Sequence, residues 1–323
     1  MDYNRISENS HYKSHNAFNR RANIPVNTVK NIVKLHQEHT TLQTKISQLK
    51  HQRGQLGERV KSSENDRAAV VEEAKKLKTE IHEVEARLAA VSEDLLSQAL
   101  LIPNDTHPDV PLGPEEAAIT LSTIGPTPTA ASPARDHITL NQTLQFMDLE
   151  AGSVSSGSSW YFLQNEGALL EMALANYAVS IAIKHGFTPV LTPDVVKEDV
   201  ATRCGFQPRD EANAAATQNY YLQRTKEEPQ LVLSGTAEIP LAAMFAEKVF
   251  EHAALPRKVV GLGRAFRAEA GARGADTRGL YRVHQFSKVE LFVVCEGAES
   301  EKQMENMRQL QTEIFQSLGL TFR

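Results

Sequence analysis

The chain has 323 residues, of which 23% are charged and 41% hydrophobic, with a formal net charge of −5 at pH 7. This composition is ordinary for a soluble protein, and the length allows two domains of usual size. The acidic balance excludes a global basic field for nucleic acid, so such a partner would need a local basic patch. Cys204 and Cys295 lie far apart without metal-ligand spacing, which indicates reduced, buried thiols in a reducing compartment.

The sequence predicts neither a membrane span nor a secretory signal. Its best apolar run, 172–183, has about a dozen residues, too few to cross a bilayer. Residues 1–27 contain Asp2 and Glu8 and have no apolar core, so they also make a poor transit peptide. We therefore expect no membrane partner. The sequence leaves open whether this chain was cut from a longer precursor.

Two heptad patterns predict a long antiparallel helical hairpin. Apolar residues alternate at spacings of three and four within 28–60 and again after a cap-rich break at 61–66. Each arm of about 30 residues would be roughly 45 Å long. The seam residues are Ile32, Leu35, Leu42, Ile46, Leu49, Leu56 and Val60 in the first arm, and Ala74, Leu77, Ile81, Val84, Leu88, Val91 and Leu95 in the second.

The two arms differ in charge. The first is mainly basic and includes Lys34, Lys45 and Arg53, whereas residues 64–94 carry nine acidic side chains against five basic ones. A basic arm can contact RNA phosphates. Arms that neutralise each other would instead leave an ordinary solvated face, and charge alone favours this second interpretation.

Seven prolines between residues 102 and 136 predict a stiff linker without long regular elements. We therefore divide the chain into an arm, 1–101, a linker, 102–136, and a globular domain, 137–323. A helix is predicted over 166–185, closed by Gly186. Its expected core side consists of Leu169, Leu170, Ala173, Leu174, Tyr177 and Ile181.

Short strands and further helices are predicted after this helix. Segment 187–196 reads as an edge strand, because Pro189 and Pro193 cannot donate within a ladder, and Pro193 marks a candidate dimer contact. The other predicted elements are strands at 220–223 and 231–233, helices over 239–250 and 298–318, and the beginning of a strand at 320–323.

Residues 259–295 carry the clearest functional pattern. Two apolar runs flank a Gly-rich polar turn, which predicts a long antiparallel strand pair. Several charged residues recur with a period of two and so share one face of the sheet, which can hold a polar ligand or form a solvated surface of ion pairs. They are Arg267 and Glu269 before the turn, and Arg282, His284, Lys288 and Glu290 after it.

A second candidate is the loop at 234–238, between a predicted strand and a helix. Thr236 and Glu238 lie where ligand-binding groups are common. A threonine followed by a glutamate near a helix start is also ordinary capping chemistry. Position alone leaves both interpretations open.

Together these motifs resemble the seryl-tRNA synthetases, which are class II aminoacyl-tRNA synthetases. The resemblance runs along nearly the whole chain and implies an α+β fold, in which an antiparallel helical hairpin (a coiled coil) precedes an antiparallel-sheet class II catalytic domain. The motifs are I-P-N-D-T-H-P-D-V-P-L-G at 102–113, T-A-E at 236–238, F-R-A-E-A-G at 266–271, D-T-R-G-L at 276–280 and R-V-H-Q-F-S-K-V-E at 282–290.

The resemblance implies a serine–tRNA ligase, which activates L-serine with ATP to seryl-adenylate and transfers it to the 3′ end of tRNA(Ser). This chemistry needs alignment and charge neutralisation. Arg267 would grip the α-phosphate and the serine carboxylate, Glu269 would lie at the adenine end, and these two are the implied catalytic residues. Arg282 would meet the γ-phosphate, and Phe286 would stack on adenine. The implied ATP-binding set is Arg267, Ala268, Glu269, Arg282, Val283 and Phe286.

The same resemblance assigns the serine and tRNA sites. Glu290 would accept the serine hydroxyl, since a buried acceptor left unpaired rejects alanine, and the loop residues Thr236, Ala237 and Glu238 would hold the amino group. The hairpin would be the tRNA-binding arm, which reverses the interpretation from charge alone. The implied tRNA contacts are Lys34, Lys45 and Arg53 on the arm and Arg273 at a loop tip that departs from the family's usual order.

The resemblance also implies a homodimer and the use of ATP with Mg²⁺. The N-terminal stretches I-S-E-N and H-N-A-F-N-R resemble the fungal organellar branch, which indicates the mitochondrial matrix, with the cytoplasm as the alternative. The family pattern continues beyond residue 323, so we expect a catalytic domain incomplete at its C-terminus and no metal ligand in this chain. The alternative function is an inactive, truncated synthetase that acts as a tRNA-binding or dimerising module.

Residues 1–323 alone are expected to show weak or absent serine-dependent ATP–pyrophosphate exchange. The reason is that the family's adenine-stacking arginine and main metal ligand have no counterpart in this sequence. Exchange at rates like those of a complete enzyme would contradict this expectation.

Overall fold

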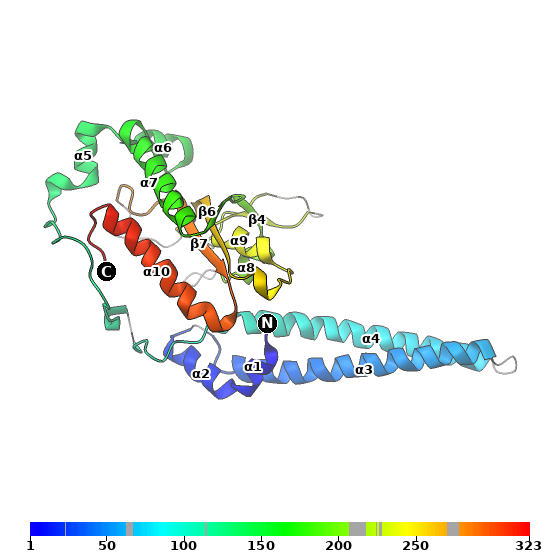
Figure 1. Ribbon diagram of the computed structural model, residues 1–323. Coiled ribbons are helices and arrows are strands. Elements are labelled where there is room, and N and C mark those ends of the chain that lie inside the picture. Colours follow the sequence, from blue (N-terminus) through cyan, green and yellow to red (C-terminus); the bar gives the residue numbers. More distant parts are fainter. Residues whose placement is uncertain are drawn as a thin grey trace. The chain divides into compact units, whose positions relative to one another are not determined.

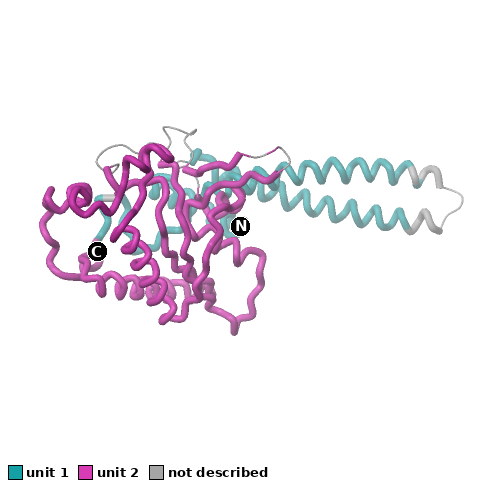
Figure 2. The backbone as a smooth tube through the Cα atoms, turned by 90° about the horizontal axis from the view of Figure 1, so that it is seen from above, with its two compact units in different colours: residues 1–119 teal, residues 120–323 magenta. Residues whose placement is uncertain are grey.

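The structure is a computed structural model, and it describes residues 1–22, 24–62, 67–113, 115–206, 218–223, 225, 228–269 and 278–323. The chain divides into two compact units, residues 1–119 and 120–323 (Figure 2). Their boundary falls inside the proline-rich segment 102–136.

The predicted helical hairpin is present in the first unit. Helices α3 (Thr28–Ser62) and α4 (Arg67–Leu100) lie side by side (Figure 1), and the apolar seam forms their common core. The side chain of Val60 and the connection at 63–66 lie outside the described residues. Three ion pairs connect the two arms: Lys45–Glu80 at 2.9 Å, Lys50–Glu85 at 2.8 Å and Glu38–Arg87 at 2.6 Å.

Two short N-terminal helices, α1 (Tyr3–Glu8) and α2 (Ser10–Asn19), are not predicted by the sequence patterns. Ile6 of α1 packs in a cluster with seam residues of α3 and α4. The linker motif is tied to α2 by several polar contacts. They include Lys13 Nζ to Asp105 at 2.6 Å, Asn16 Nδ2 to the Asn104 carbonyl at 3.0 Å, and Thr106 Oγ1 to Asn16 Oδ1 at 2.7 Å.

The predicted strand pair is confirmed in the second unit. Strands β6 (Arg257–Phe266) and β7 (Gln285–Val294) are antiparallel along ten residues each. Strand β3 (Thr188–Leu191) pairs with β6 in parallel, so the sheet order is β3-β6-β7. The sheet is therefore mixed, and β3 is the edge strand that Pro189 predicts.

The two faces of β6 and β7 pack against different helices. On one face, α7 (Asn165–Lys184) and α10 (Ser300–Ser317) cover the sheet (Figure 1), and their core includes Val260. On the other face, α9 (Glu238–Phe245) packs through a cluster that contains Val259 and Phe292. Since alternate residues of a strand point to opposite faces, even-numbered residues of β7 lie on the α9 side.

Smaller elements complete the second unit. The predicted strand at 320–323 is represented by one bridge, between Phe322 and Ile124. Its other elements are helices α5 (His137–Leu144), α6 (Leu149–Ser156) and α8 (Glu198–Arg203), antiparallel pairs of β1 (Met147–Asp148) with β2 (Phe162–Leu163) and of β4 (Val195–Lys197) with β5 (Leu231–Leu233), and 3₁₀ turns at Pro133–Arg135, His252–Ala254 and Gly297–Glu299. A further 3₁₀ turn, Glu115–Ala117, belongs to the first unit.

The predicted core side of α7 is wrong for its N-terminal half. Leu169, Leu170 and Leu174 are 64%, 59% and 41% exposed, whereas Ile181 is 4% exposed. The helix is apolar on several sides, and only its C-terminal part packs against β6 and α10. Among the described residues it is also a helix long and apolar enough to cross a membrane by length and composition alone, a test that core helices of soluble proteins also pass.

Three further predictions need correction. The predicted strand at 220–223 contributes a single bridge, between Tyr221 and Val232, and the helix predicted over 239–250 ends at Phe245. Cys204 and Cys295 are free thiols, as expected, but both are half-buried rather than buried. In each case tertiary contacts, which local patterns do not record, decide the outcome.

Replacing Leu95 by alanine tests the hairpin core. Leu95 is 0% exposed, so Leu95→Ala should lower the free energy of unfolding by about 2–5 kcal/mol. The neighbouring residue Leu96 is 38% exposed, and Leu96→Ala should change it by about 0.5 kcal/mol or less. Urea unfolding followed by circular dichroism would measure both, and equal losses would contradict the predicted seam.

Candidate active site

Three polar side chains meet on the α9 side of the sheet. Thr236 Oγ1 donates to Glu290 Oε2 at 2.7 Å, and Lys288 Nζ lies 2.6 Å from the same oxygen. Lys288 Nζ also donates to Thr236 Oγ1 at 3.0 Å. The threonine is buried, and the other two side chains are 31% and 21% exposed. The result is a half-buried polar pocket in which an ammonium group neutralises a carboxylate.

Lys288 is a residue of this pocket that the sequence motifs left without a role. The signal was present, since Lys288 lies two residues before Glu290 and therefore on the same face of β7. Its contact with Thr236, 52 residues away in sequence, depends on how α9 packs on the sheet. The period-two pattern therefore indicated the face but not the partner.

The loop between β5 and α9 is held in place by hydrogen bonds of Ser234 and by close packing at Gly235. Ser234, which is 1% exposed, donates its hydroxyl to the Thr236 carbonyl at 2.7 Å and accepts the Phe266 N–H at 2.9 Å. A Cβ on Gly235 would come within 2.2 Å of the Phe206 ring, so only glycine allows this close approach. These contacts hold Thr236 against the end of β6.

The three residues of the T-A-E motif have different environments. Thr236 Oγ1 accepts the Glu238 N–H at 3.3 Å, so it acts near the helix start as well as in the pocket. Ala237 is 2% exposed and packs with Leu241 and Val259, which leaves only its backbone for a ligand. Burial, and then the charge of Glu238, raise the pKa of the Cys204 thiol, so this carboxylate lies toward α8.

Arg267 lies directly beyond the end of β6, next to this pocket. Its Nε donates to the Gly235 carbonyl at 3.4 Å, and its guanidinium lies over the Phe286 ring, 5.2 Å from the centroid. A cation above an aromatic face is attracted to it. The Gly235 carbonyl belongs to the peptide group just before Thr236, so Arg267 binds the backbone directly beside the polar pocket.

A second ion pair lies farther along the two chain segments. Arg282 Nη1 lies 2.8 Å from Glu269 Oε2, with side chains 44% and 16% exposed. Glu269 has a left-handed backbone with φ of 48°, and the Ala268 N–H donates to the Gln218 carbonyl at 3.0 Å. Val283 is 7% exposed, so little of its side chain can reach a nucleotide. The ion-pair interpretation of the charged face therefore holds for Arg282–Glu269 and Lys288–Glu290, and ligand binding by this face stays a prediction.

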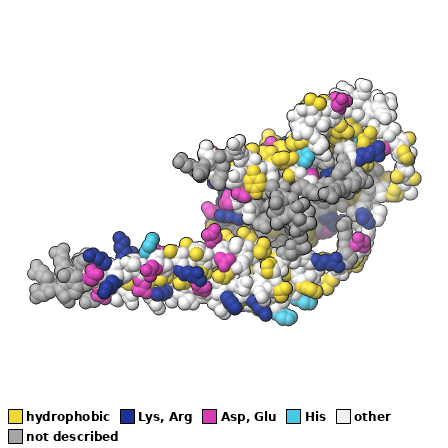
Figure 3. Space-filling view, turned by 180° about the vertical axis from the view of Figure 1, so that it is seen from behind, with side chains coloured by type: hydrophobic (Ala, Val, Ile, Leu, Met, Phe, Trp, Pro, Cys, Tyr) yellow, Lys and Arg dark blue, Asp and Glu magenta, His cyan; other side chains and the backbone are white. Residues whose placement is uncertain are grey.

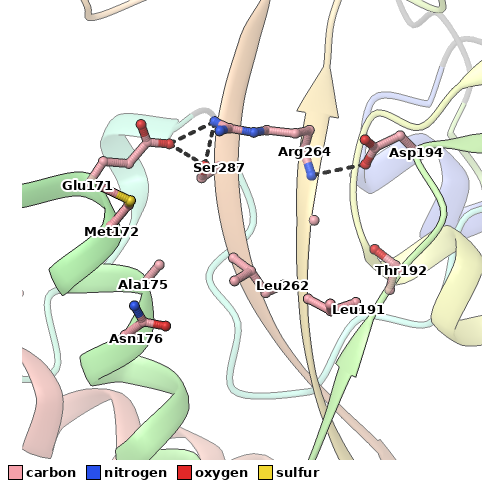
Figure 4. A pocket seen from close by; sticks show the side chains of 11 residues that line it. Glu171, Met172, Ala175, Asn176, Leu191, Thr192, Asp194, Leu262, Arg264 and Ser287 are labelled. Carbon is pink, nitrogen blue, oxygen red and sulfur yellow. Dashed lines mark hydrogen bonds and ion pairs between the residues drawn. The ribbon is translucent and has the colours of Figure 1, made fainter. Parts of the chain in front are cut away.

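The opposite face of the sheet holds a separate pocket of about 430 Å³ between α7, β3, β6 and β7 (Figure 4). Arg264 Nη1 contacts Glu171 Oε1 at 2.8 Å and donates to Ser287 Oγ at 2.7 Å, and the Arg264 N–H donates to Asp194 at 3.3 Å. Ser287 and Lys288 are consecutive in β7, so this pocket lies on the other side of the sheet from Thr236 and Glu290.

The predicted tRNA contacts lie partly within the described residues. Lys34 and Arg53 are exposed, while Lys45 is half-exposed and paired with Glu80. Basic and acidic side chains alternate along the hairpin (Figure 3). Arg273 lies outside the described residues. Cross-arm pairing supports the neutralised-face interpretation at Lys45, and the pKa of Glu85 on the other arm is lowered by Lys50 first and then by the charge of Arg53.

Comparison with known proteins decides the family. Residues 1–106 match the family described as "Seryl-tRNA synthetase N-terminal domain", and residues 220–323 match "tRNA synthetase class II core domain (G, H, P, S and T)". The serine–tRNA ligase of Treponema denticola is 37% identical over 326 residues, which cover 100% of this chain and 75% of that protein. The chain belongs to the seryl-tRNA synthetase family.

Two further relatives agree with this family. The mitochondrial serine–tRNA ligase of Schizosaccharomyces pombe is 36% identical over 327 residues, covering 100% of this chain and 68% of that protein. The crystal structure of seryl-tRNA synthetase from Pyrococcus horikoshii complexed with ATP superimposes with a TM-score of 0.82 at 28% identity, covering 100% of this chain and 76% of that one. The family and the α+β fold class inferred from the motifs are confirmed.

The described residues do not fit a Mg²⁺ site. They contain no group of three or more His, Cys, Asp or Glu side chains that could hold a metal ion. The site's carboxylates at Glu269 and Glu290 are already paired with Arg282 and Lys288. Mg²⁺ prefers free carboxylate and phosphate oxygens, and these two paired carboxylates are not free to bind it.

Proposed function

We propose that this chain is a serine–tRNA ligase and that the α9 side of β6 and β7 binds ATP and L-serine. The reaction forms seryl-adenylate from L-serine and ATP, and then transfers the seryl group to the 3′ end of tRNA(Ser). The observation that carries the proposal is the polar pocket of Thr236, Lys288 and Glu290 beside Arg267, in a chain whose whole length matches serine–tRNA ligases. The non-catalytic alternative is not favoured, because the relatives named above are ligases.

In the first step a serine carboxylate oxygen attacks the α-phosphorus, and pyrophosphate leaves. Arg267 can bind both reacting groups, because a guanidinium presents two parallel donors to carboxylate or phosphate oxygens. Positioning and charge neutralisation of this kind contribute most to such a reaction. The guanidinium now lies over the Phe286 ring, 5.2 Å from its centroid. When it turns to bind the phosphate and carboxylate, the Phe286 ring would stack on adenine.

The nucleotide's other contacts follow from neighbouring residues. Arg282 lies 2.8 Å from Glu269 and is 44% exposed, so it can reach a terminal phosphate while Glu269 stays near the adenine end. Ala268 and Val283 would contribute backbone groups, because the Val283 side chain is buried. These assignments place the triphosphate along the continuation of β6 and β7.

The polar pocket suits the serine side chain. Glu290 can accept the serine hydroxyl, and contacts with Thr236 and Lys288 fix this carboxylate in place. Alanine would leave the acceptor unpaired, which costs more than a lost contact in a half-buried site. Glu238 and the backbone of Ala237 would hold the amino group from the start of α9.

Binding measurements test the proposal without requiring turnover. Arg267→Lys should weaken ATP binding about tenfold or more, because hydrogen bonds to charged groups contribute about 1.5–3 kcal/mol. Arg257, an exposed arginine at the far end of β6, provides the matched control Arg257→Lys, which should bind ATP like the unaltered chain. Glu290→Gln should weaken serine binding in the presence of ATP and leave ATP binding alone. Titration calorimetry measures each, and equal affinities for the two arginine variants would contradict the assignment.

We also propose that the hairpin binds tRNA(Ser) through its phosphates. A groove along α3, of about 760 Å³, is lined by polar residues that include His36, Thr40 and Lys45. Lys34 and Arg53 lie on the same helix and are exposed. Exposed basic side chains along one helix suit a phosphate backbone.

Salt dependence tests the hairpin contacts. Lys34→Ala and Arg53→Ala should each weaken tRNA binding and reduce the slope of log K against log salt by about one. Lys302→Ala, on the exposed side of α10, should leave the slope unchanged. Filter binding over a salt series measures the slopes, and three identical slopes would remove the arm residues from the interface.

We further propose a homodimer and a mitochondrial location. Exposed apolar residues of α7 and the edge strand, with Leu169 at 64% and Leu191 at 83% exposed, lie near the exposed Pro193 and offer a surface for a second copy. The mitochondrial S. pombe relative supports the matrix, although bacterial relatives are equally similar.

A further inference from the structure

Strands β6 and β7 separate at the position of Arg267. Their last ladder pair is Phe266 with Gln285. At the next position the Arg267 N–H donates to the His284 carbonyl at 3.0 Å, as an antiparallel pair requires. The return bond is different, because the His284 N–H donates to the Ser159 carbonyl at 3.2 Å instead.

The imidazole of His284 provides the donor that its backbone does not. Its Nδ1 lies 3.0 Å from the Arg267 carbonyl oxygen and 2.8 Å from the Tyr220 hydroxyl. A carbonyl oxygen can only accept, so the proton must be on Nδ1, and the Tyr220 oxygen accepts a share of the same N–H. The side chain thus completes the two-bond pairing of Arg267 with His284.

Two aromatic rings hold this imidazole. Trp160 stacks on it at 5.6 Å with an interplanar angle of 26°, and Tyr220 meets it edge-on at 6.0 Å and 77°. Burial, and then the charge of Glu269, raise the pKa of Tyr220, so its hydroxyl stays neutral. The ring has little freedom to rotate away from the Arg267 carbonyl.

The Arg267 backbone needs this support because the chain leaves the sheet immediately after this residue. The next residue, Ala268, donates to Gln218 rather than to β7, and Glu269 turns into the left-handed region. The His284 carbonyl and the His284 imidazole therefore fix Arg267 at the fork. The guanidinium then reaches the Gly235 carbonyl and the Phe286 ring from a set position.

We propose that His284 is a positioning residue, whose Nδ1–H holds the Arg267 carbonyl where β6 and β7 part and so orients the guanidinium toward ATP. The proposal rests on the proposed role of Arg267 in ATP binding. The imidazole itself touches neither substrate. Its contribution is geometric, since a small displacement of a phosphate-binding guanidinium lengthens its hydrogen bonds.

A pair of amide substitutions isolates the donor position. In His284→Asn the amide nitrogen can occupy the place of Nδ1, whereas in His284→Gln it extends to the place of Nε2. Trp160 is the single tryptophan of the chain and stacks on residue 284, so its emission during an ATP titration reports binding at this fork. His284→Gln should weaken ATP binding about threefold to tenfold, the usual contribution of one hydrogen bond, and His284→Asn should retain most of it.

The following outcomes decide whether His284 positions Arg267. Serine binding, measured by calorimetry, should be the same in both variants, because Thr236 and Glu290 are held by other contacts. Equal ATP affinities for Asn and Gln, or parallel losses of ATP and serine binding with a lower melting temperature, would show a packing role and overturn the proposal. If the unaltered chain itself fails to bind ATP, the proposed function fails first. Tyr220→Phe, which keeps the ring and the Nδ1–H, should bind ATP like the unaltered chain, and a loss equal to that of His284→Gln would also overturn the proposal.

Discussion

The antiparallel ladder between β6 and β7 sets the positions of the whole candidate site. Ten residue pairs fix the register, and this register places Lys288 and Glu290 on the face that α9 covers. A shift of one residue would turn both side chains toward α7 and α10. The buried residues Val259 and Val260 prevent such a shift, because each packs in a different cluster on its own face.

The end of the ladder matters as much as its length. Arg267 is the first residue after β6, and opposite it His284, the residue before β7, donates its backbone N–H to Ser159. The opening separates the two segments enough for Glu269 and Arg282 to pair across them. The regular ladder holds Lys288 and Glu290 in place, and the chain beyond it places Arg267, Glu269 and Arg282 next to them.

The hairpin depends on a different interaction. Its cross-arm ion pairs are largely exposed, and such pairs contribute little to stability. The buried seam, including Ile32 and Leu95 at 0% exposed, provides the stabilisation. The charges are therefore free to serve recognition, as we propose for Lys34 and Arg53.

The sequence by itself determined the hairpin, the long strand pair, the edge position of β3 and the family. Each depends on local periodicity, on proline chemistry or on motifs in a fixed order. Only the tertiary structure decided that Lys288 joins Thr236 and Glu290, that the Ala237 side chain belongs to the core, and that His284 supports Arg267. The physical reason is that each of these contacts joins segments far apart in the chain, or depends on which face a neighbouring helix covers, and local patterns do not record either.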